Sequence, residues 1–100
     1  MRIIWAPIAL DRAEEAARYI AGDRPAAAAK WIDELFDAVS DLKTFPHKGR
    51  MVPEVGRTEI REVLFGQYRV IYRLEENRLF VLTVRHQRRH FSESTLMEEQ

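Results

Sequence analysis

The chain has 100 residues, a length that fits one domain, and its composition of 46% hydrophobic and 32% charged residues is typical of a globular protein. It contains no cysteine, which excludes disulfides, thiolate chemistry and cysteine zinc sites. No apolar stretch is long enough to span a bilayer, and the start MRIIWAP lacks the apolar core of a signal peptide. We expect a cytoplasmic protein with no membrane association, no metal and no cofactor.

The net charge of zero conceals two halves of opposite sign. Residues 11–41 include eight acidic and four basic side chains, whereas residues 43–91 include eleven basic and five acidic ones. The tail, residues 92–100, has three acidic side chains and no basic one. The basic half predicts a polyanionic partner, either nucleic acid or an acidic protein. The alternative is that these arginines are solvated residues on strand surfaces.

The first half of the chain predicts a short strand and then a pair of helices. Arg2 to Trp5 is β-branched and short, as in a strand, and Pro7 suits the first turn of a helix that runs to Ala21. Gly22 is a suitable residue to end that helix. Its apolar face consists of Ala13, Ala16, Ala17 and Ile20.

The second helix has the clearest pattern in the chain and follows from Pro25. Its apolar residues recur at steps of three and four: Trp31, Ile32, Leu35, Phe36, Val39 and Leu42. Its acidic residues occupy the opposite side: Asp33, Glu34, Asp37 and Asp41. Because the connection between the helices is short, we expect them to form an antiparallel hairpin.

The second half predicts a loop and three strands. Residues 44–57 include two prolines and two glycines without periodicity, which indicates a loop. The three strand candidates are residues 58–65, 67–74 and 78–86. They should form an antiparallel meander, and the N-terminal strand should join the same sheet because it is too short to be stable alone. The expected fold is α+β, with the hairpin packed on one face of the sheet.

Alternation along residues 67–74 separates the tyrosines from the arginines. Tyr68, Val70 and Tyr72 share one face, whereas Arg69 and Arg73 share the other. If the tyrosine face meets the helices, the arginine face becomes an open basic concavity. Arginine suits phosphate or carboxylate because its planar group donates two parallel hydrogen bonds. The candidates for binding phosphate or an acidic partner are Arg61, Arg73, Arg85, Arg88 and Arg89.

The segments FPHKGR, REVLFGQYRVIYRL and VLTVRHQRR, at these separations, resemble the RelE/ParE superfamily of bacterial toxins. The resemblance covers almost the whole chain, from Arg2 to about Phe91. It implies the toxin of a type II toxin–antitoxin pair, neutralised in a hetero-oligomer with its cognate antitoxin. RelE-like members cut messenger RNA in the ribosomal A site, whereas ParE-like members inhibit DNA gyrase.

A metal-independent ribonuclease needs a base near the 2′-hydroxyl, an acid near the leaving oxygen and positive charge on the phosphate. The resemblance places Arg69 where RNA-cutting members carry an important arginine. The other catalytic candidates are His86, Arg89 and Glu62, with His90 as a substitute for His86. The alternative for His86 is a hydrogen bond at the sheet edge.

Other features favour the gyrase-directed members. Phe91 stands where ribonuclease members often have an aromatic hydroxyl, and Lys48 is the only lysine of the central loop. The long hairpin and the H-x-R-R ending also resemble the ParE-like group, in which Arg69, His86 and Arg89 would be structural or interface residues. A further alternative is an inactive relic that only binds antitoxin. The hairpin residues expected to contact antitoxin are Trp31, Glu34 and Leu35, with core packing as the alternative for Trp31.

Overall fold

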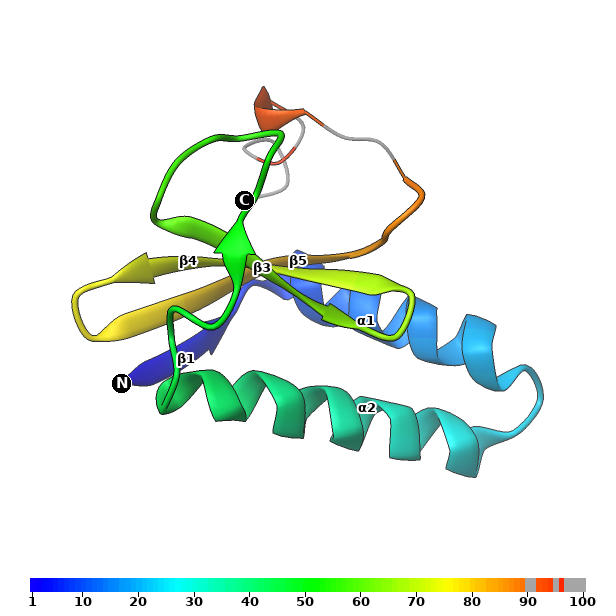
Figure 1. The fold of residues 1–100 in the computed structure, drawn as a ribbon. Helices are drawn as coiled ribbons and strands as arrows, with labels where there is room; N and C mark the ends of the chain where they lie inside the picture. Colours follow the sequence, from blue (N-terminus) through cyan, green and yellow to red (C-terminus); the bar gives the residue numbers. More distant parts are fainter. Residues whose placement is uncertain (90–91, 95, 97–100) are drawn as a thin grey trace.

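A computed structural model describes residues 1–89, 92–94 and 96. It has one five-stranded sheet, in the order β1-β5-β4-β3-β2, with two helices on one face (Figure 1). In chain order the elements are β1 (Arg2–Trp5), α1 (Pro7–Ala21), α2 (Pro25–Ser40), the 3-10 turn η1 (Asp41–Lys43), β2 (Arg50–Met51), β3 (Ile60–Phe65), β4 (Tyr68–Glu75) and β5 (Arg78–His86). The predicted α+β fold is confirmed.

Both helices of the hairpin begin where the sequence predicts, and α1 also ends where it predicts. Pro7 and Pro25 occupy the first turn of each helix, and Gly22 ends α1 at a φ of 59°, which glycine adopts without strain. Small side chains form the buried face of α1: Ala9, Ala13, Ala16, Ala17 and Ala21. Ile20 was expected on that face but is 44% exposed, because the hairpin end projects past the strands (Figure 1).

The helix α2 packs beside α1 and under β3 and β4. Leu35 and Val39 are buried, and the ring of Trp31 meets the rings of Phe65 and Tyr68 edge-on, at centroid distances of 5.3 and 5.6 Å. The predicted helical pattern reached Leu42, but α2 ends at Ser40 and the chain tightens into η1. That turn keeps Leu42 in the core.

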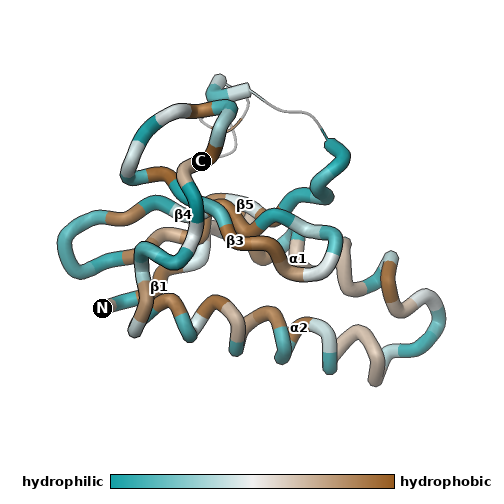
Figure 2. The backbone as a smooth tube through the Cα atoms, viewed as in Figure 1, coloured by the Kyte–Doolittle hydropathy of each residue, from teal (hydrophilic) through white to brown (hydrophobic). Residues whose placement is uncertain are grey.

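The three predicted strands form the expected antiparallel meander, and β1 joins the same sheet parallel to β5. The segment predicted as a loop contains the short strand β2, in which Met51 pairs with Arg61 of β3. Two residues are too few for alternation to reveal a strand. Figure 2 shows hydrophobic stretches along the strands and α2, with hydrophilic turns between them.

Apolar side chains fill both faces of the sheet. The helix-side core includes Ala9, Ala13, Leu35, Val39, Leu42, Val70, Tyr72, Leu79, Val81 and Val84. On the opposite side, here called the far face, a second core comprises Val52, Ile60, Ile71, Leu82 and Leu96. The segment between β2 and β3 lies over this face, as do residues 92–94 and 96 (Figure 1). The expectation of an open basic concavity is therefore wrong, because Val52 and Leu96 cover the sheet there.

Candidate functional site

Strand pairing decides which face of the sheet each candidate side chain occupies. Residues directly opposite one another on neighbouring strands share a face. Leu64 pairs with Arg69 and Glu62 pairs with Ile71, so Arg69 and Glu62 both lie on the far face. Arg61 pairs with Tyr72 and lies on the helix side. The arginines of the meander therefore do not form one basic surface.

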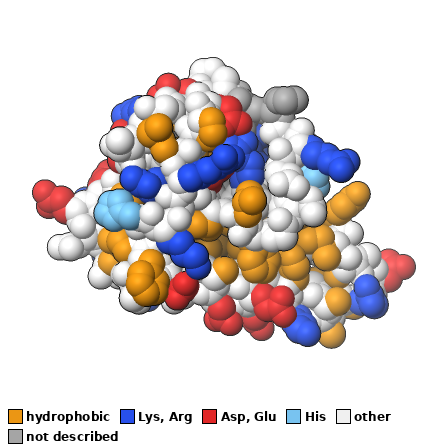
Figure 3. All heavy atoms as spheres, viewed as in Figure 1, with side chains coloured by type: hydrophobic (Ala, Val, Ile, Leu, Met, Phe, Trp, Pro, Cys, Tyr) orange, Lys and Arg blue, Asp and Glu red, His pale blue; other side chains and the backbone are white. Residues whose placement is uncertain are grey.

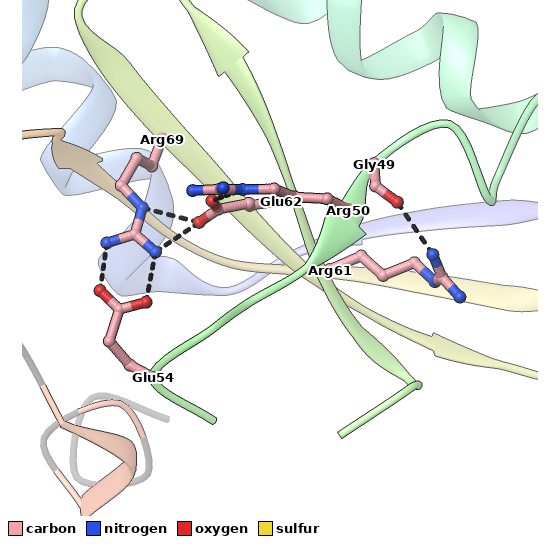
Figure 4. A network of polar contacts seen from close by, with 6 residues as sticks. All are labelled: Gly49, Arg50, Glu54, Arg61, Glu62 and Arg69. Carbon is pink, nitrogen blue, oxygen red and sulfur yellow. Dashed lines mark hydrogen bonds and ion pairs between the residues drawn. The ribbon is translucent and has the colours of Figure 1, made fainter. Parts of the chain in front are cut away.

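Four charged residues on the far face form a closed network, here called the arginine–glutamate cluster: Arg50, Glu54, Glu62 and Arg69 (Figure 4). The Glu62 side chain is only 1% exposed. It accepts hydrogen bonds from Arg50 Nε at 2.7 Å and from Arg69 Nε at 2.6 Å. Arg69 also donates from Nη1 and Nη2 to the two oxygens of Glu54, at 2.6 and 2.7 Å. The cluster contains two positive and two negative groups, so it presents no net charge.

The pKa values reflect this pairing. Hydrogen bonds from Arg69 hold the pKa of the Glu54 carboxyl below its usual range, and the same bonds raise the pKa of Arg69. The Arg69 side chain is 7% exposed, and a buried guanidinium needs such partners to offset its lost hydration. Arg69 is thus held by two carboxylates and offers little surface to a ligand.

The other arginines of the far face are also packed. Arg85 lies opposite Arg69 on β5 and is 7% exposed. Arg73 forms an ion pair with Glu75 at 3.2 Å, and its guanidinium lies over the ring of Phe80 at 4.7 Å. Of the arginines predicted to bind phosphate or an acidic partner, only Arg88 and Arg89 are exposed, in the turn after β5.

A tyrosine fixes the loop that supplies two members of the cluster. The hydroxyl of Tyr72 accepts a hydrogen bond from the Gly49 amide at 3.0 Å and donates one to the Pro46 carbonyl at 2.9 Å. Arg61 donates to the Gly49 carbonyl at 2.9 Å. Burial raises the pKa of Tyr72, so its hydroxyl stays protonated as a donor. These bonds position Arg50 beside Glu62.

His86 lies on the helix side of the sheet. It pairs with Tyr68 across β4 and β5, and the two rings meet edge-on at 5.3 Å. Its Nδ1 accepts a hydrogen bond from the Arg88 amide at 3.1 Å. His86 is part of a groove of about 550 Å³, here called the β5-end groove, whose polar and aromatic lining includes Arg12, Tyr19, Tyr68, His86, Arg88 and Arg89.

The sheet therefore separates the four catalytic candidates. Arg69 and Glu62 lie on the far face, whereas His86 lies on the helix face. Arg89, at the strand end, lines both the β5-end groove and a hollow of about 330 Å³ beside Arg69. His90 and Phe91 lie outside the described residues.

The hairpin residues expected to face antitoxin have different surroundings. Glu34 is exposed and lies 4.0 Å from Lys30. The structure places Leu35 in the core, at 0% exposure, rather than on a surface available to a partner. Trp31 is half-buried against Phe65 and Tyr68, as its alternative interpretation predicted.

Sequence reasoning missed the contributions of Arg50 and Glu54 to the cluster, and of Arg12 and Tyr19 to the groove. One signal was present, because Glu54 is the only acidic residue in an otherwise basic loop. Over residues 1–89, 92–94 and 96, no three His, Asp or Glu side chains gather as metal ligands would. No helix in that same part of the chain has the length and apolar character needed to cross a membrane.

Comparison with known proteins identifies the family. The model of the ParE toxin of the type II toxin–antitoxin system parDE matches residues 3–91. Among solved structures, the fold is similar to a chain of the chromosomal ParDE toxin–antitoxin system from P. aeruginosa, with a TM-score of 0.70 at 16% identity. That match covers 86% of this chain and 95% of the other. No curated protein matches the sequence. Because the family match spans most of the sequence, the chain belongs to the ParE toxin family of type II toxin–antitoxin systems.

Proposed function

We propose that this toxin inhibits DNA gyrase in the ParE-like mode and does not cut messenger RNA. The observation that carries the proposal is the position of His86 on one face of the sheet and of Arg69 with Glu62 on the other. The family match to ParE supports the same choice.

The separation matters because RNA cleavage needs its catalytic groups around one phosphate. A general acid or base acts within hydrogen-bond reach of the proton that it transfers, about 2.6–3.2 Å or one water away. His86 and Glu62 point away from each other through a sheet whose two faces are both packed with apolar side chains. One scissile phosphate cannot contact both side chains in this arrangement.

The hydrogen bonds that Arg69 makes to two carboxylates are the second observation that supports the proposal. A catalytic arginine stabilises the charge that develops on the phosphate, and this requires an accessible guanidinium with donors to spare. Here Glu54 and Glu62 engage all three nitrogens of Arg69, and their negative charge opposes the approach of an anion. We assign Arg69 a structural role, in which it ties the β2–β3 segment to the sheet.

In this proposal the toxin acts in the bacterial cytoplasm, where its target is found, and the cognate antitoxin holds it inactive in a hetero-oligomer. Loss of the antitoxin would release the toxin and stop growth. A plasmid or chromosomal region that encodes the pair would thereby be retained.

Two assays on one sample test the proposal. Toxin released from its antitoxin would be added to purified gyrase with relaxed plasmid, and to ribosomes programmed with messenger RNA. We expect loss of supercoiling and intact RNA, with both effects judged against toxin neutralised by antitoxin. RNA cleavage with unchanged supercoiling would contradict the proposal. If neither target responds although the chain still binds antitoxin, the protein is a binding-only relic and the proposal is also wrong.

A further inference from the structure

The β5-end groove is a second surface that the arginine–glutamate cluster does not include. We propose that it binds a short acidic segment of the cognate antitoxin, with carboxylates on its arginines and an apolar or aromatic side chain against its tyrosines. The inference rests on membership of a toxin–antitoxin family and not on which target the toxin attacks.

The charge of the groove selects an acidic occupant. Arg12, Arg88 and Arg89 supply its positive charge, since the side chain of Arg85, which also borders it, lies on the far face. Its one carboxylate is Glu15, which lies 3.5 Å from Arg12 on the next turn of α1. Arg88 and Arg89 extend the positive charge into the exposed turn after β5. In Figure 3 basic side chains stand beside a histidine at the right-hand edge of the molecule. Complementary charge across an interface steers association and rejects partners of the wrong sign.

The aromatic residues indicate that the occupant is a protein. Tyr19 is 82% exposed, the largest exposed fraction among the large hydrophobic side chains of the described residues. Tyr68 is half-buried and is braced by Trp31 on one side and His86 on the other. Tyrosine and arginine dominate the binding energy of protein interfaces, whereas lysine is depleted there. The groove contains both favoured residue types and no lysine.

A nucleic acid fits the same groove less well. Single-stranded RNA or DNA needs a basic track that follows its backbone over several nucleotides. The helix that forms one wall also carries exposed acidic residues, among them Asp11 and Glu14, and Glu14 lies 3.9 Å from Arg18. A long polyanion would meet these charges beyond the groove. A short peptide segment with two or three carboxylates would not.

The test measures the affinity of the toxin for the antitoxin encoded beside it, by calorimetry on refolded toxin. We expect Arg88→Glu to weaken binding by about 100-fold and Tyr19→Ala by about 30-fold, as for central interface residues. The wild-type affinity should fall as salt rises, and Arg88→Glu should flatten that dependence. The control is Arg2→Glu, an equal charge reversal at an exposed residue that pairs with Arg78 at the opposite end of β5. We expect it to bind within about twofold of wild type, as surface changes away from an interface do.

Thermal unfolding of each free variant separates a lost contact from a misfolded chain. The proposal is supported if the groove variants melt like wild type and bind antitoxin weakly. It is overturned if their affinity equals that of Arg2→Glu. It is equally overturned if antitoxin affinity is unchanged while gyrase inhibition or RNA binding is lost, because the groove would then contact the target. Antitoxin affinity is measured without gyrase, so an error in the assigned target leaves this test unaffected.

Discussion

Arg69 of β4 donates a hydrogen bond from Nε to Glu62 of β3 at 2.6 Å, and neither side chain is more than 7% exposed. Both strands are interior strands of the sheet. The ion pair lies on the far face, where the segment between β2 and β3 contacts the sheet. Glu54, in the segment between β2 and β3, accepts two further hydrogen bonds from Arg69 and so links that segment to the sheet. These charged residues therefore hold the far face together.

Substitution Arg69→Ala should destabilise the toxin by about 3–5 kcal/mol, because it leaves the buried Glu62 carboxylate without its main partner. Chemical denaturation of toxin released from antitoxin measures the change. The control is Arg78→Ala, which removes an exposed ion pair to Glu75 and should cost less than about 0.5 kcal/mol. Equal losses in the two variants would show that the cluster adds nothing to stability.

The cluster also predicts a dependence of stability on pH. The pKa of Glu54 is lowered in the folded state by its bonds to Arg69, so the folded chain binds the proton less readily than the unfolded chain. Its contribution is complete above the pKa of an unfolded glutamate, about 4.3, and is lost as pH falls through the lower folded pKa. In urea titrations from pH 7 to pH 3, Glu54→Gln should be less stable at pH 7 and should converge with wild type at the acid end. Parallel curves would be inconsistent with a lowered pKa.

Leu96 should stabilise the far face although it is close to the C-terminus. It is 0% exposed and packs with Val52, Ile60, Ile71 and Leu82. Leu96→Ala should cost about 2–4 kcal/mol, the usual result for a buried leucine. The matched control is Leu64→Ala, which is 62% exposed on β3 and should change stability by less than about 0.5 kcal/mol. A neutral Leu96→Ala would mean that Leu96 does not cover the far face in solution.

Gly49 should tolerate no side chain. A Cβ at this position would clash with the Tyr72 hydroxyl and would lie 2.6 Å from the Glu62 carbonyl oxygen, which belongs to a paired strand that cannot easily move. Gly49→Ala should therefore lower the melting temperature more than Tyr72→Phe, which removes two hydrogen bonds and should cost about 1–3 kcal/mol. Gly56→Ala is a suitable comparison, since Gly56 has open space around it but a φ of 70°. A Gly49→Ala variant that melts like wild type would contradict the close approach.

The sequence predicted the elements better than the surfaces. Alternation along β4 assigned Tyr68 and Arg69 to opposite faces correctly, and proline and glycine marked the helix ends. The segments that cover each face of the sheet could not be predicted from local sequence patterns. Val52 and Leu96 come from segments without periodicity, so nothing in their local pattern indicated that they would cover the far face.

The candidate site was predicted as a list of residues but not as an arrangement. Arg85 and His86 are adjacent in sequence, and only the strand register shows that their neighbours across the sheet are Arg69 and Tyr68 on opposite faces. The carboxylate partners of Arg69 are seven and fifteen residues away in the chain, beyond the reach of any local rule. Tyr19 lies on the first helix, for which the sequence predicted only the apolar face that packs in the core, so its place in the β5-end groove was missed.

The most direct test of the target is the order in which synthesis stops in living cells. Toxin expression would be induced without antitoxin, and incorporation of labelled thymidine and labelled methionine would be followed over the first minutes. Gyrase inhibition predicts that DNA synthesis falls first while protein synthesis continues, and that co-expressed antitoxin prevents the fall. Protein synthesis that stops first, with DNA synthesis still running, would contradict the account and assign the toxin to messenger RNA.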